Sequence, residues 1–315
     1  MKHSAKVFHL TARTVRAHSP LHSPDSCHWT WRHLRATFRS GMQAACLMPN
    51  HVHLLGTWPD PALARTTLLQ VLRKIPGSAA TIWDCPKVVL PMNSPVHHLR
   101  SLKYIALNPV RDGLCRDPLE FYWSTYRDYL GATATPWVDG RQLAAHFDQA
   151  LDPWRDWFQT YLAKDASRTL AWRFTPTSQG EFTPERPQWP VHTLGEIYQA
   201  AMSAHRAHPM EFQKRKNVVR TTFLALARAN GWRSPTTLGH FLQITPNAVY
   251  QQLQKKPNAA AYRAAWICLG DERLWRSYPW LGPTPIPNPS MVTPGRQQKC
   301  GNSIDTLPNA PHSSS

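Results

Sequence analysis

The chain has 315 residues, 42% of them hydrophobic, which is enough for two domains with buried cores. Lys and Arg number 36 against 19 Asp and Glu, and the net charge of +17 favours a polyanionic partner, nucleic acid before an anionic membrane surface. The sequence has neither the apolar run of about 18 residues that a membrane span needs nor an apolar segment after its basic N-terminus. Its six cysteines include no Cys-x-x-Cys pair, so we expect a cytoplasmic protein without a membrane anchor, zinc ribbon or disulfide framework.

The first elements in the chain alternate between strand and helix. Residues 5–13 alternate in polarity and are predicted to form a strand, whereas residues 14–27, rich in Ser, Pro and His, are predicted to form a loop. Residues 29–40 have the apolar spacing of a helix that ends at Gly41. The basic side of this helix carries Arg32, Arg35 and Arg39. That pattern fits a solvated face and a phosphate-binding face equally well.

Residues 42–58 are predicted to form a buried strand with its lead-in, and they contain the string Met-Pro-Asn-His-Val-His-Leu-Leu. His51 and His53 are two residues apart, so on a strand both imidazoles point to the same face. Two converging imidazoles suit a divalent metal ion. The alternative is a pair of hydrogen-bonded histidines within a sheet.

The next helix is predicted over residues 62–74, between a cap at Asp60-Pro61 and a stop at Pro76-Gly77. Residues 83–95 contain three prolines and are predicted to be mostly irregular.

A second candidate site lies in residues 99–111, which have a helical pattern. Pro109 is expected to end this helix, because the residue before a proline avoids the helical region. Arg100, Tyr104 and Asn108 are spaced one turn apart and share one face. A tyrosine placed between an arginine and an amide is a candidate nucleophile, and an ordinary surface tyrosine is the alternative. The preceding His97 and His98 are candidate extra metal ligands.

The chain after residue 131 divides into an extension and a second domain. Residues 132–136 are predicted to be a linker and residues 141–165 to be helical. Prolines in residues 174–190 mark a domain break, and the segment from residue 283, rich in Pro, Ser and Asn, is predicted to be disordered.

The second domain is predicted to begin near residue 191, where Thr193 and Glu196 have the spacing of a capping box. Basic residues then dominate the stretch from residue 205 to residue 233: Arg206, Lys214, Arg215, Lys216, Arg220, Arg228 and Arg233, against Glu211 alone.

Residues 235–242 and 246–255 have the spacing of a helix-turn-helix, with Thr245 as N-cap and Pro246 in the first turn of the second helix. The inward contacts are expected from Leu238, Leu242, Val249 and Leu253, and the outward side chains of the recognition helix are expected to be Asn247, Tyr250, Gln251 and Gln254. The alternative is a plain helical bundle without a DNA contact.

The two central strings together resemble a known family. The histidine string resembles the histidine–hydrophobe–histidine motif of the single-tyrosine HUH transposases, and Tyr-Ile-Ala-Leu-Asn-Pro-Val-Arg, from Tyr104 to Arg111, resembles their tyrosine helix. Residues 116–131 are similar to the segment that closes the domain in the repeat-associated branch, so the resemblance covers residues 5–131. Residues 191–282 resemble, more loosely, the C-terminal DNA-binding domain of bacterial replication initiators.

The resemblance implies an α+β fold in which an antiparallel sheet with helices, a ferredoxin-like or RRM-like HUH domain, precedes an all-α helix-turn-helix domain. The expected boundaries are 1–135 for the HUH domain, 136–190 for a helical extension with a Pro-rich linker, 191–282 for the second domain and 283–315 for a disordered tail. The resemblance also implies that the first strand lies beside the histidine strand and that a short strand or hairpin falls within residues 83–95.

The resemblance also implies a chemistry. Mg²⁺ or Mn²⁺ would be held by His51 and His53, with Asn108 as the third ligand, because an oxygen ligand beside two imidazoles suits these metals. Tyr104 would attack single-stranded or hairpin DNA and form a 5′-phosphotyrosine link, in a possible homodimer. The predicted DNA contacts are Arg100, Lys103, Arg111, Arg127, Lys214, Arg215, Lys216, Asn247, Tyr250 and Gln251.

Other functions fit parts of the same pattern. A catalytically silent, sequence-specific DNA-binding regulator is the alternative, and an RNA binder is a weaker one. Residues 14–28 lack the glycine-rich turn often seen in the family, which bears on hairpin recognition more than on catalysis. Arg111 also has a structural alternative, as a cap of the helix end.

Overall fold

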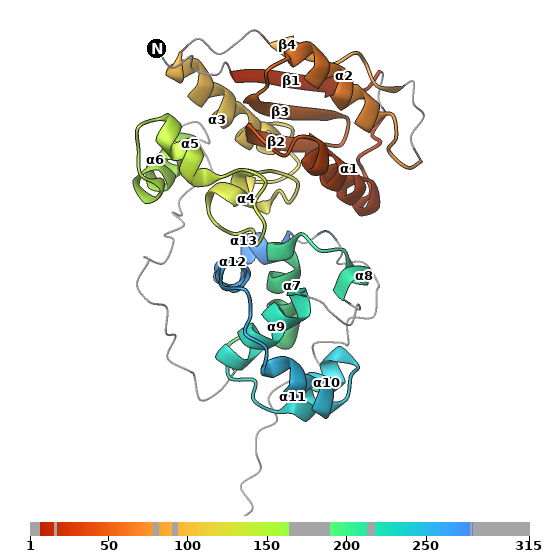
Figure 1. Ribbon diagram of the computed structural model, residues 1–315, viewed down its shortest axis with the longest axis vertical. Helices are drawn as coiled ribbons and strands as arrows, with labels where there is room; N and C mark the ends of the chain where they lie inside the picture. Colours follow the sequence, from red (N-terminus) through yellow and green to blue (C-terminus); the bar gives the residue numbers. More distant parts are fainter. Residues whose placement is uncertain are drawn as a thin grey trace, which may run out of the picture.

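The computed structural model describes residues 7–15, 18–77, 82–89, 94–163, 190–212, 218–277 and 279. An N-terminal part with a four-stranded antiparallel sheet is followed along the long axis of the molecule by a helical C-terminal part (Figure 1). The fold is therefore α+β, as predicted. No helix within the described ranges is long and apolar enough to cross a membrane.

The sheet has the strand order β2-β3-β1-β4. Its strands are β1 (Val7–Arg13), β2 (Met42–Met48), β3 (His51–Thr57) and β4 (Lys87–Val89). All three pairings are antiparallel, and β1 lies beside the histidine strand β3 as expected. The predicted single strand over residues 42–58 was wrong: Pro49 and Asn50 form a two-residue turn, and β2 and β3 make a hairpin around it.

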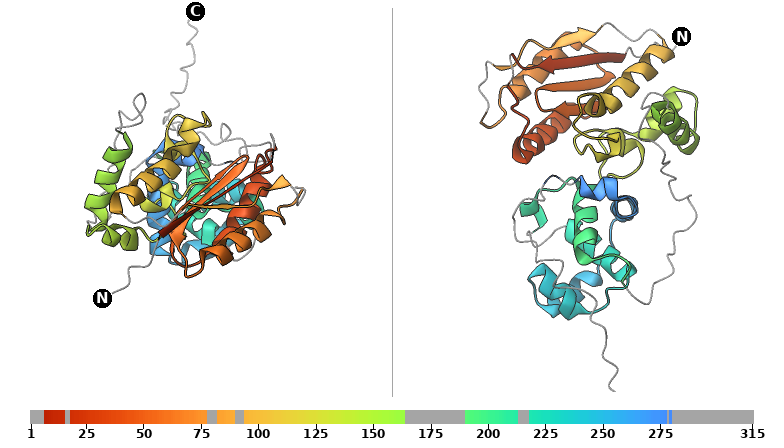
Figure 2. Two further views of the ribbon diagram at one scale, coloured as in Figure 1. Left: turned by 90° about the horizontal axis from the view of Figure 1, so that it is seen from above. Right: turned by 180° about the vertical axis from the view of Figure 1, so that it is seen from behind.

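Helices cover both faces of this sheet. Those of the N-terminal part are α1 (Pro24–Thr37), α2 (Pro61–Leu72), α3 (Pro95–Arg111), the 3-10 helix η2 (Pro118–Glu120), α4 (Tyr126–Tyr129), α5 (Gly140–His146) and α6 (Leu151–Ala163). Seen from above, α3 lies on one side of the sheet and α1 and α2 lie on the other (Figure 2). Apolar side chains fill the interior between the sheet and its helices, and Leu10, Leu54 and Leu55 of the central strands are fully buried.

Helix α1 corrects the loop predicted over residues 14–27. The helix begins at Pro24 because Ser23 caps it, accepting the backbone N–H of Ser26, while Pro24 occupies the first turn and Asp25 favours the positive end of the helix dipole. It ends at Thr37, before the predicted stop at Gly41.

Helix α3 continues to Arg111, past the end predicted at Pro109. Its interior proline removes one N–H near the last turn, and the turn still closes because the N–H groups of Asp112 and Gly113 donate to the carbonyls of Asn108 and Val110. Asn108 is therefore held in a regular helix, one turn after Tyr104.

The helical stretch predicted over residues 141–165 is two helices, α5 and α6, separated near Asp148, whose φ is 54°. Helix α6 packs on α3: the Lys103 ammonium lies 4.0 Å from the centre of the Tyr161 ring. The Pro-rich break predicted over residues 174–190 lies almost wholly outside the described residues, as does the tail from residue 283.

The C-terminal part consists of α7 (Leu194–His205), α8 (Pro209–Phe212), α9 (Val218–Ala229), α10 (Pro235–Leu242), α11 (Pro246–Leu253), α12 (Ala259–Leu269) and α13 (Glu272–Arg276). The capping box of Thr193 and Glu196 is present. Helices α10 and α11 match the predicted pair to within two residues, and they lie at the end of the molecule remote from the sheet (Figure 2). The turn between them lies so close to α10 that a Cβ on Gly239 would be 2.7 Å from the carbonyl oxygen of Ile244.

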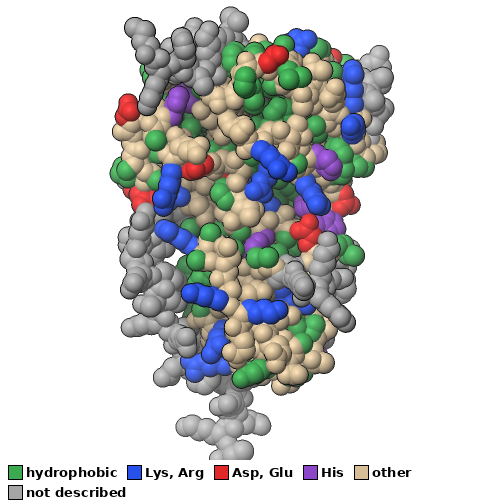
Figure 3. All heavy atoms as spheres, viewed as in Figure 1, with side chains coloured by type: hydrophobic (Ala, Val, Ile, Leu, Met, Phe, Trp, Pro, Cys, Tyr) green, Lys and Arg blue, Asp and Glu red, His purple; other side chains and the backbone are tan. Residues whose placement is uncertain are grey.

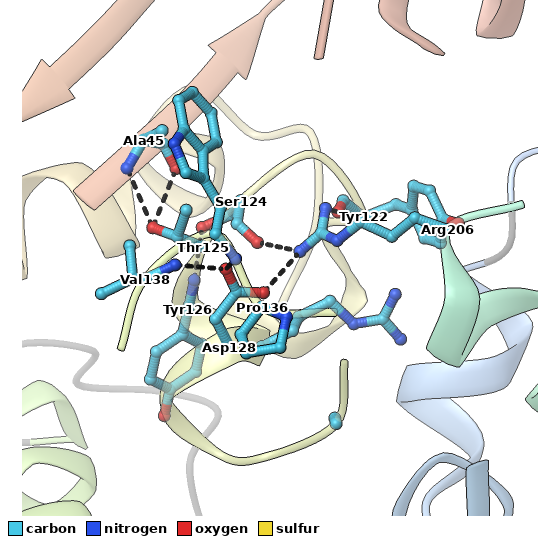
Figure 4. A network of polar contacts seen from close by, with 12 residues as sticks. Ala45, Tyr122, Ser124, Thr125, Tyr126, Asp128, Pro136, Val138 and Arg206 are labelled. Atoms are coloured by element: carbon cyan, nitrogen blue, oxygen red, sulfur yellow. Dashed lines mark hydrogen bonds and ion pairs between the residues drawn. The ribbon is translucent and has the colours of Figure 1, made fainter. Parts of the chain in front are cut away.

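The two parts are joined by buried polar contacts around Arg206, which follows α7 in the left-handed conformation. Its guanidinium donates to the carbonyls of Tyr122 and Ser124, both at 2.6 Å, and pairs with Asp128 at 3.4 Å (Figure 4). The other oxygen of Asp128 accepts the backbone N–H groups of Trp137 and Val138. One arginine thus ties the end of α7 to the segment that runs along the edge of β2.

Candidate active site

The histidine pair projects from β3 toward α3. His51 and His53 are 8% and 4% exposed, and their ring centres are 4.9 Å apart. Antiparallel pairing places Thr11 opposite His53 and Arg13 opposite His51. Because alternate residues of a strand share a face, these β1 residues line the same side of the sheet. The predicted convergence of the two imidazoles is therefore present.

Helix α3 supplies the other half of the site. Ser94 caps this helix by accepting the backbone N–H of His97, and Pro95 stands in its first turn. Tyr104 is 41% exposed, and its ring centre lies 5.4 Å from that of His53. One turn later, Asn108 is buried with its Oδ1 3.0 Å from Nε2 of His51.

Both histidines of the pair have a contact at Nδ1. Nδ1 of His51 lies 2.7 Å from Oδ1 of Asn50, an oxygen that can only accept a hydrogen bond. Nδ1 of His53 lies 3.0 Å from Nε2 of His9 on β1. Nε2 of His53 is buried and has no hydrogen-bond partner among the described residues.

Burial keeps these histidines neutral. Desolvation lowers the pKa of His53 to about 2 and that of His9 to about 4. The pKa of His51 is also lowered, again chiefly by burial. A neutral His51 carries one N–H, but each of its ring nitrogens lies beside an amide oxygen, Oδ1 of Asn50 or Oδ1 of Asn108, so one of these contacts sets two acceptors face to face. Two acceptors in contact repel each other unless a cation or a proton lies between them.

These donors fit a divalent cation. Nε2 of His51 faces Oδ1 of Asn108 at the junction of β3 and α3, and Nε2 of His53 is buried without a partner among the described residues. With the ring protons on Nδ1, all three atoms would present a lone pair. No group of three or more His, Cys, Asp and Glu side chains in the described part of the chain is placed to hold a metal, so the third protein ligand would be the Asn108 amide. Two imidazoles and one oxygen leave room for water and phosphate oxygens.

An open cleft of about 500 Å³ lies over this junction. Its lining residues are His9, Thr11, Arg13, His51, His53, Arg100, Ser101 and Tyr104. Two of them are arginines, and the guanidinium of Arg111 lies 5.3 Å from the centre of the Tyr104 ring. A phosphodiester in this cleft would meet the positive charge of the arginines, the phenol of Tyr104 and the histidine pair together.

The structure places the other predicted site residues differently. Lys103 is buried and donates to the carbonyl of Tyr161, and Arg127 is buried and donates to the carbonyl of Leu274. Neither side chain is exposed for a DNA contact, and both instead hold neighbouring elements together. His98 is buried against His146 and Phe147, away from the cleft, and His97 is exposed. The predicted extra ligands are therefore not at the site.

The C-terminal candidates are partly described. Asn247, Tyr250, Gln251 and Gln254 are exposed on or at the end of α11, as the helical spacing predicted. Lys214, Arg215 and Lys216 lie outside the described residues. Blue Lys and Arg side chains extend over the C-terminal helices in the face seen in Figure 3, where acidic side chains are sparse.

Four cleft residues were missed in the sequence: His9, Thr11 and Arg13 on β1 and Ser101 on α3. The three on β1 occupy alternate positions of the first predicted strand, so the period of two was the signal that identifies them as one face. The face that meets the histidines follows only from the register of β1 against β3.

Comparison with family models and with curated proteins finds no match for this chain. Among solved structures, the chain is similar to a REP-associated tyrosine transposase bound to a REP hairpin, with 18% identity and a TM-score of 0.34. The similarity covers 38% of this chain and 76% of that one. At this level of similarity the functional case depends on the geometry of the site itself.

Proposed function

We propose that this protein is a metal-dependent transposase that cleaves and rejoins single-stranded DNA at hairpin repeats through a 5′-phosphotyrosine intermediate. The observation that carries the proposal is the grouping of three potential metal ligands, Nε2 of His51, Nε2 of His53 and Oδ1 of Asn108, near the ring of Tyr104. A purely structural histidine pair would have its buried nitrogens satisfied by protein partners.

In the proposed reaction, the Tyr104 oxygen attacks phosphorus and gives up its proton. The bond from phosphorus to the 3′ oxygen breaks, and that oxygen takes up a proton to become a free 3′-hydroxyl. The phosphate stays on tyrosine as a 5′ link, and a later 3′-hydroxyl attacks it and restores a phosphodiester. One bond is exchanged for another of the same kind, so the cycle consumes no ATP.

The site residues have distinct roles in this proposal. His51, His53 and Asn108 would hold Mg²⁺ or Mn²⁺, which polarises the phosphate and stabilises the extra charge of the transition state. Arg13 and Arg100 would bind the DNA backbone from the walls of the cleft. Arg111, beside the Tyr104 ring, would hold a neighbouring phosphate.

The proposed substrate is single-stranded DNA next to a hairpin, because an open cleft gives a flexible strand the in-line approach that attack by tyrosine needs. The similar solved transposase is one bound to a REP hairpin, which suggests the first substrate to test. The exposed face of α11, with Asn247, Tyr250 and Gln251, is proposed as a second DNA contact on a duplex.

The deciding experiment is a denaturing gel of the full chain incubated with Mn²⁺ and hairpin DNA from the repeats that flank its gene. We expect a covalent protein–DNA band that is lost in EDTA and in Tyr104→Phe. Tyr198→Phe, an equally conservative change of a half-buried tyrosine on α7, is the matched control and should keep the band. An adduct that survives Tyr104→Phe would exclude this nucleophile.

The exposed face of α11 also favours a second candidate function, a catalytically silent DNA-binding regulator. Tight, metal-independent binding to the same DNA without an adduct would support it over the transposase.

A further inference from the structure

His9 is the buried residue of the cleft to which the proposed chemistry gives no part. It lies on β1 opposite Leu55, diagonal to His53, and only 8% of it is exposed. Its Nε2 is 3.0 Å from Nδ1 of His53, and the two ring centres are 5.1 Å apart. The contact joins the first strand of the chain to a proposed metal ligand.

The direction of this hydrogen bond decides what His53 can bind. A neutral imidazole has one N–H and one lone pair. If His9 donates, the proton of His53 must sit on Nε2, which is buried with no partner among the described residues. If His53 donates through Nδ1, its Nε2 becomes a lone pair, and a buried lone pair beside the cleft can bind a cation.

His51 offers a parallel. Its Nδ1 lies 2.7 Å from the Asn50 side-chain oxygen, which can only accept, and its Nε2 faces Asn108. With the proton on Nδ1, Asn50 accepts it and Nε2 is left for a cation. Metal-binding histidines are commonly oriented in this way by a partner on the other ring nitrogen.

We propose that His9 is a positioning residue that accepts the Nδ1–H of His53 and so fixes the tautomer in which Nε2 of His53 binds the metal. The proposal rests on the proposed function for the existence of the metal site. His9 itself is not a ligand in this arrangement, because it contacts the ring nitrogen opposite to the one left free for the cation.

Two variants of the full chain test the role. His9→Gln retains an acceptor oxygen near the position of Nε2, whereas His9→Phe fills the space without one. We expect Mn²⁺ affinity, measured by calorimetry, to stay within a few-fold of wild type in His9→Gln and to fall about 10- to 100-fold in His9→Phe. The matched control is His97→Gln, an exposed histidine of α3, which should leave the affinity unchanged.

Nitrogen-15 NMR of the metal-free wild-type protein gives a readout that does not depend on variant folding. The proposal predicts that His53 is protonated on Nδ1. A proton on Nε2, equal Mn²⁺ affinities of His9→Phe and wild type, or equal losses in His9→Gln and His9→Phe would each overturn it. If the wild type bound no Mn²⁺ at all, the proposed metal site would fail, while the NMR result would still decide the tautomer.

Discussion

Asn108 faces His51 with an atom that can only accept, and this contact connects the tyrosine helix to the histidine strand. The two atoms are 3.0 Å apart and are held from opposite layers of the domain, the strand β3 and the helix α3. Nδ1 of His51 also faces an amide oxygen, that of Asn50, so the one N–H of a neutral ring cannot serve both contacts. The contact without the proton sets two acceptors face to face, which is the physical basis for expecting a cation here.

Asn108→Ala should therefore weaken Mn²⁺ binding, on the order of tenfold or more, because it removes the oxygen ligand and leaves two imidazoles. Asn108→Asp should bind Mn²⁺ more tightly than wild type, because the oxygen gains a negative charge while its position is kept. Calorimetric titration of both variants checks the pair. A weaker affinity in Asn108→Asp than in Asn108→Ala would mean that this oxygen does not contact the metal.

At this scale the sequence predicts residues whose partners are fixed by local spacing. The spacing of two between His51 and His53, and of four between Tyr104 and Asn108, determines shared faces in a strand and a helix. Lys103 could not be placed in this way. Lys103 is next to Tyr104 in the sequence and was expected on the surface. In the fold, it is covered by α6, a helix that is distant in the chain. His9 likewise depends on a pairing between strands.

Among the elements, cap residues located some helix starts and not others. The helices after Thr193 and Thr245 were predicted from their caps, whereas those after Ser23 and Ser94, which have the same kind of cap, were predicted to begin later. The hairpin at Pro49-Asn50 was missed although both are common turn residues, because the apolar stretches on either side were taken together as one strand.

The C-terminal end of α7 holds the interface between the two parts of the molecule, through Arg206. This arginine was predicted only as part of a basic stretch, yet 8% of it is exposed and it lies over the Trp31 ring at 4.2 Å. Its partner Asp128 is fully buried. A positive charge in the sequence therefore did not distinguish an arginine that binds DNA from one that joins the two parts of the molecule.

Arg206→Met should lower the free energy of unfolding by about 3–5 kcal/mol, because it leaves the Asp128 carboxylate buried without its cation. It also leaves the carbonyls of Tyr122 and Ser124 without a donor. Urea unfolding of the full chain measures the change, and Arg228→Met, at an exposed arginine of α9, is the control. A loss as small as that of the control would mean that the buried pair contributes little to holding the parts together.

At the scale of the whole molecule, buried neutral histidines in both parts couple stability to pH. Burial lowers the pKa of His98 on α3, and that of His205 on α7, to about 4 in each case. In the unfolded chain both return to about 6.5. Above pH 6.5 neither the folded nor the unfolded chain binds these protons, so the two neutral histidines reduce the free energy of unfolding by nothing. As pH falls from 6.5 toward 4, only the unfolded chain takes them up, and the folded state loses stability.

We therefore expect the free energy of unfolding to decrease steadily between pH 6.5 and pH 4, with a shallower slope in His98→Phe, which keeps a ring in the buried position and removes one titrating group. The neighbouring His97→Phe, at an exposed site, should keep the wild-type slope. Urea unfolding is measured at several pH values in EDTA, which removes any bound metal. The slope of the free energy of unfolding against pH then depends only on proton uptake. An unchanged slope in His98→Phe would show that His98 is not kept neutral by the fold, and that the acid sensitivity must come from other groups.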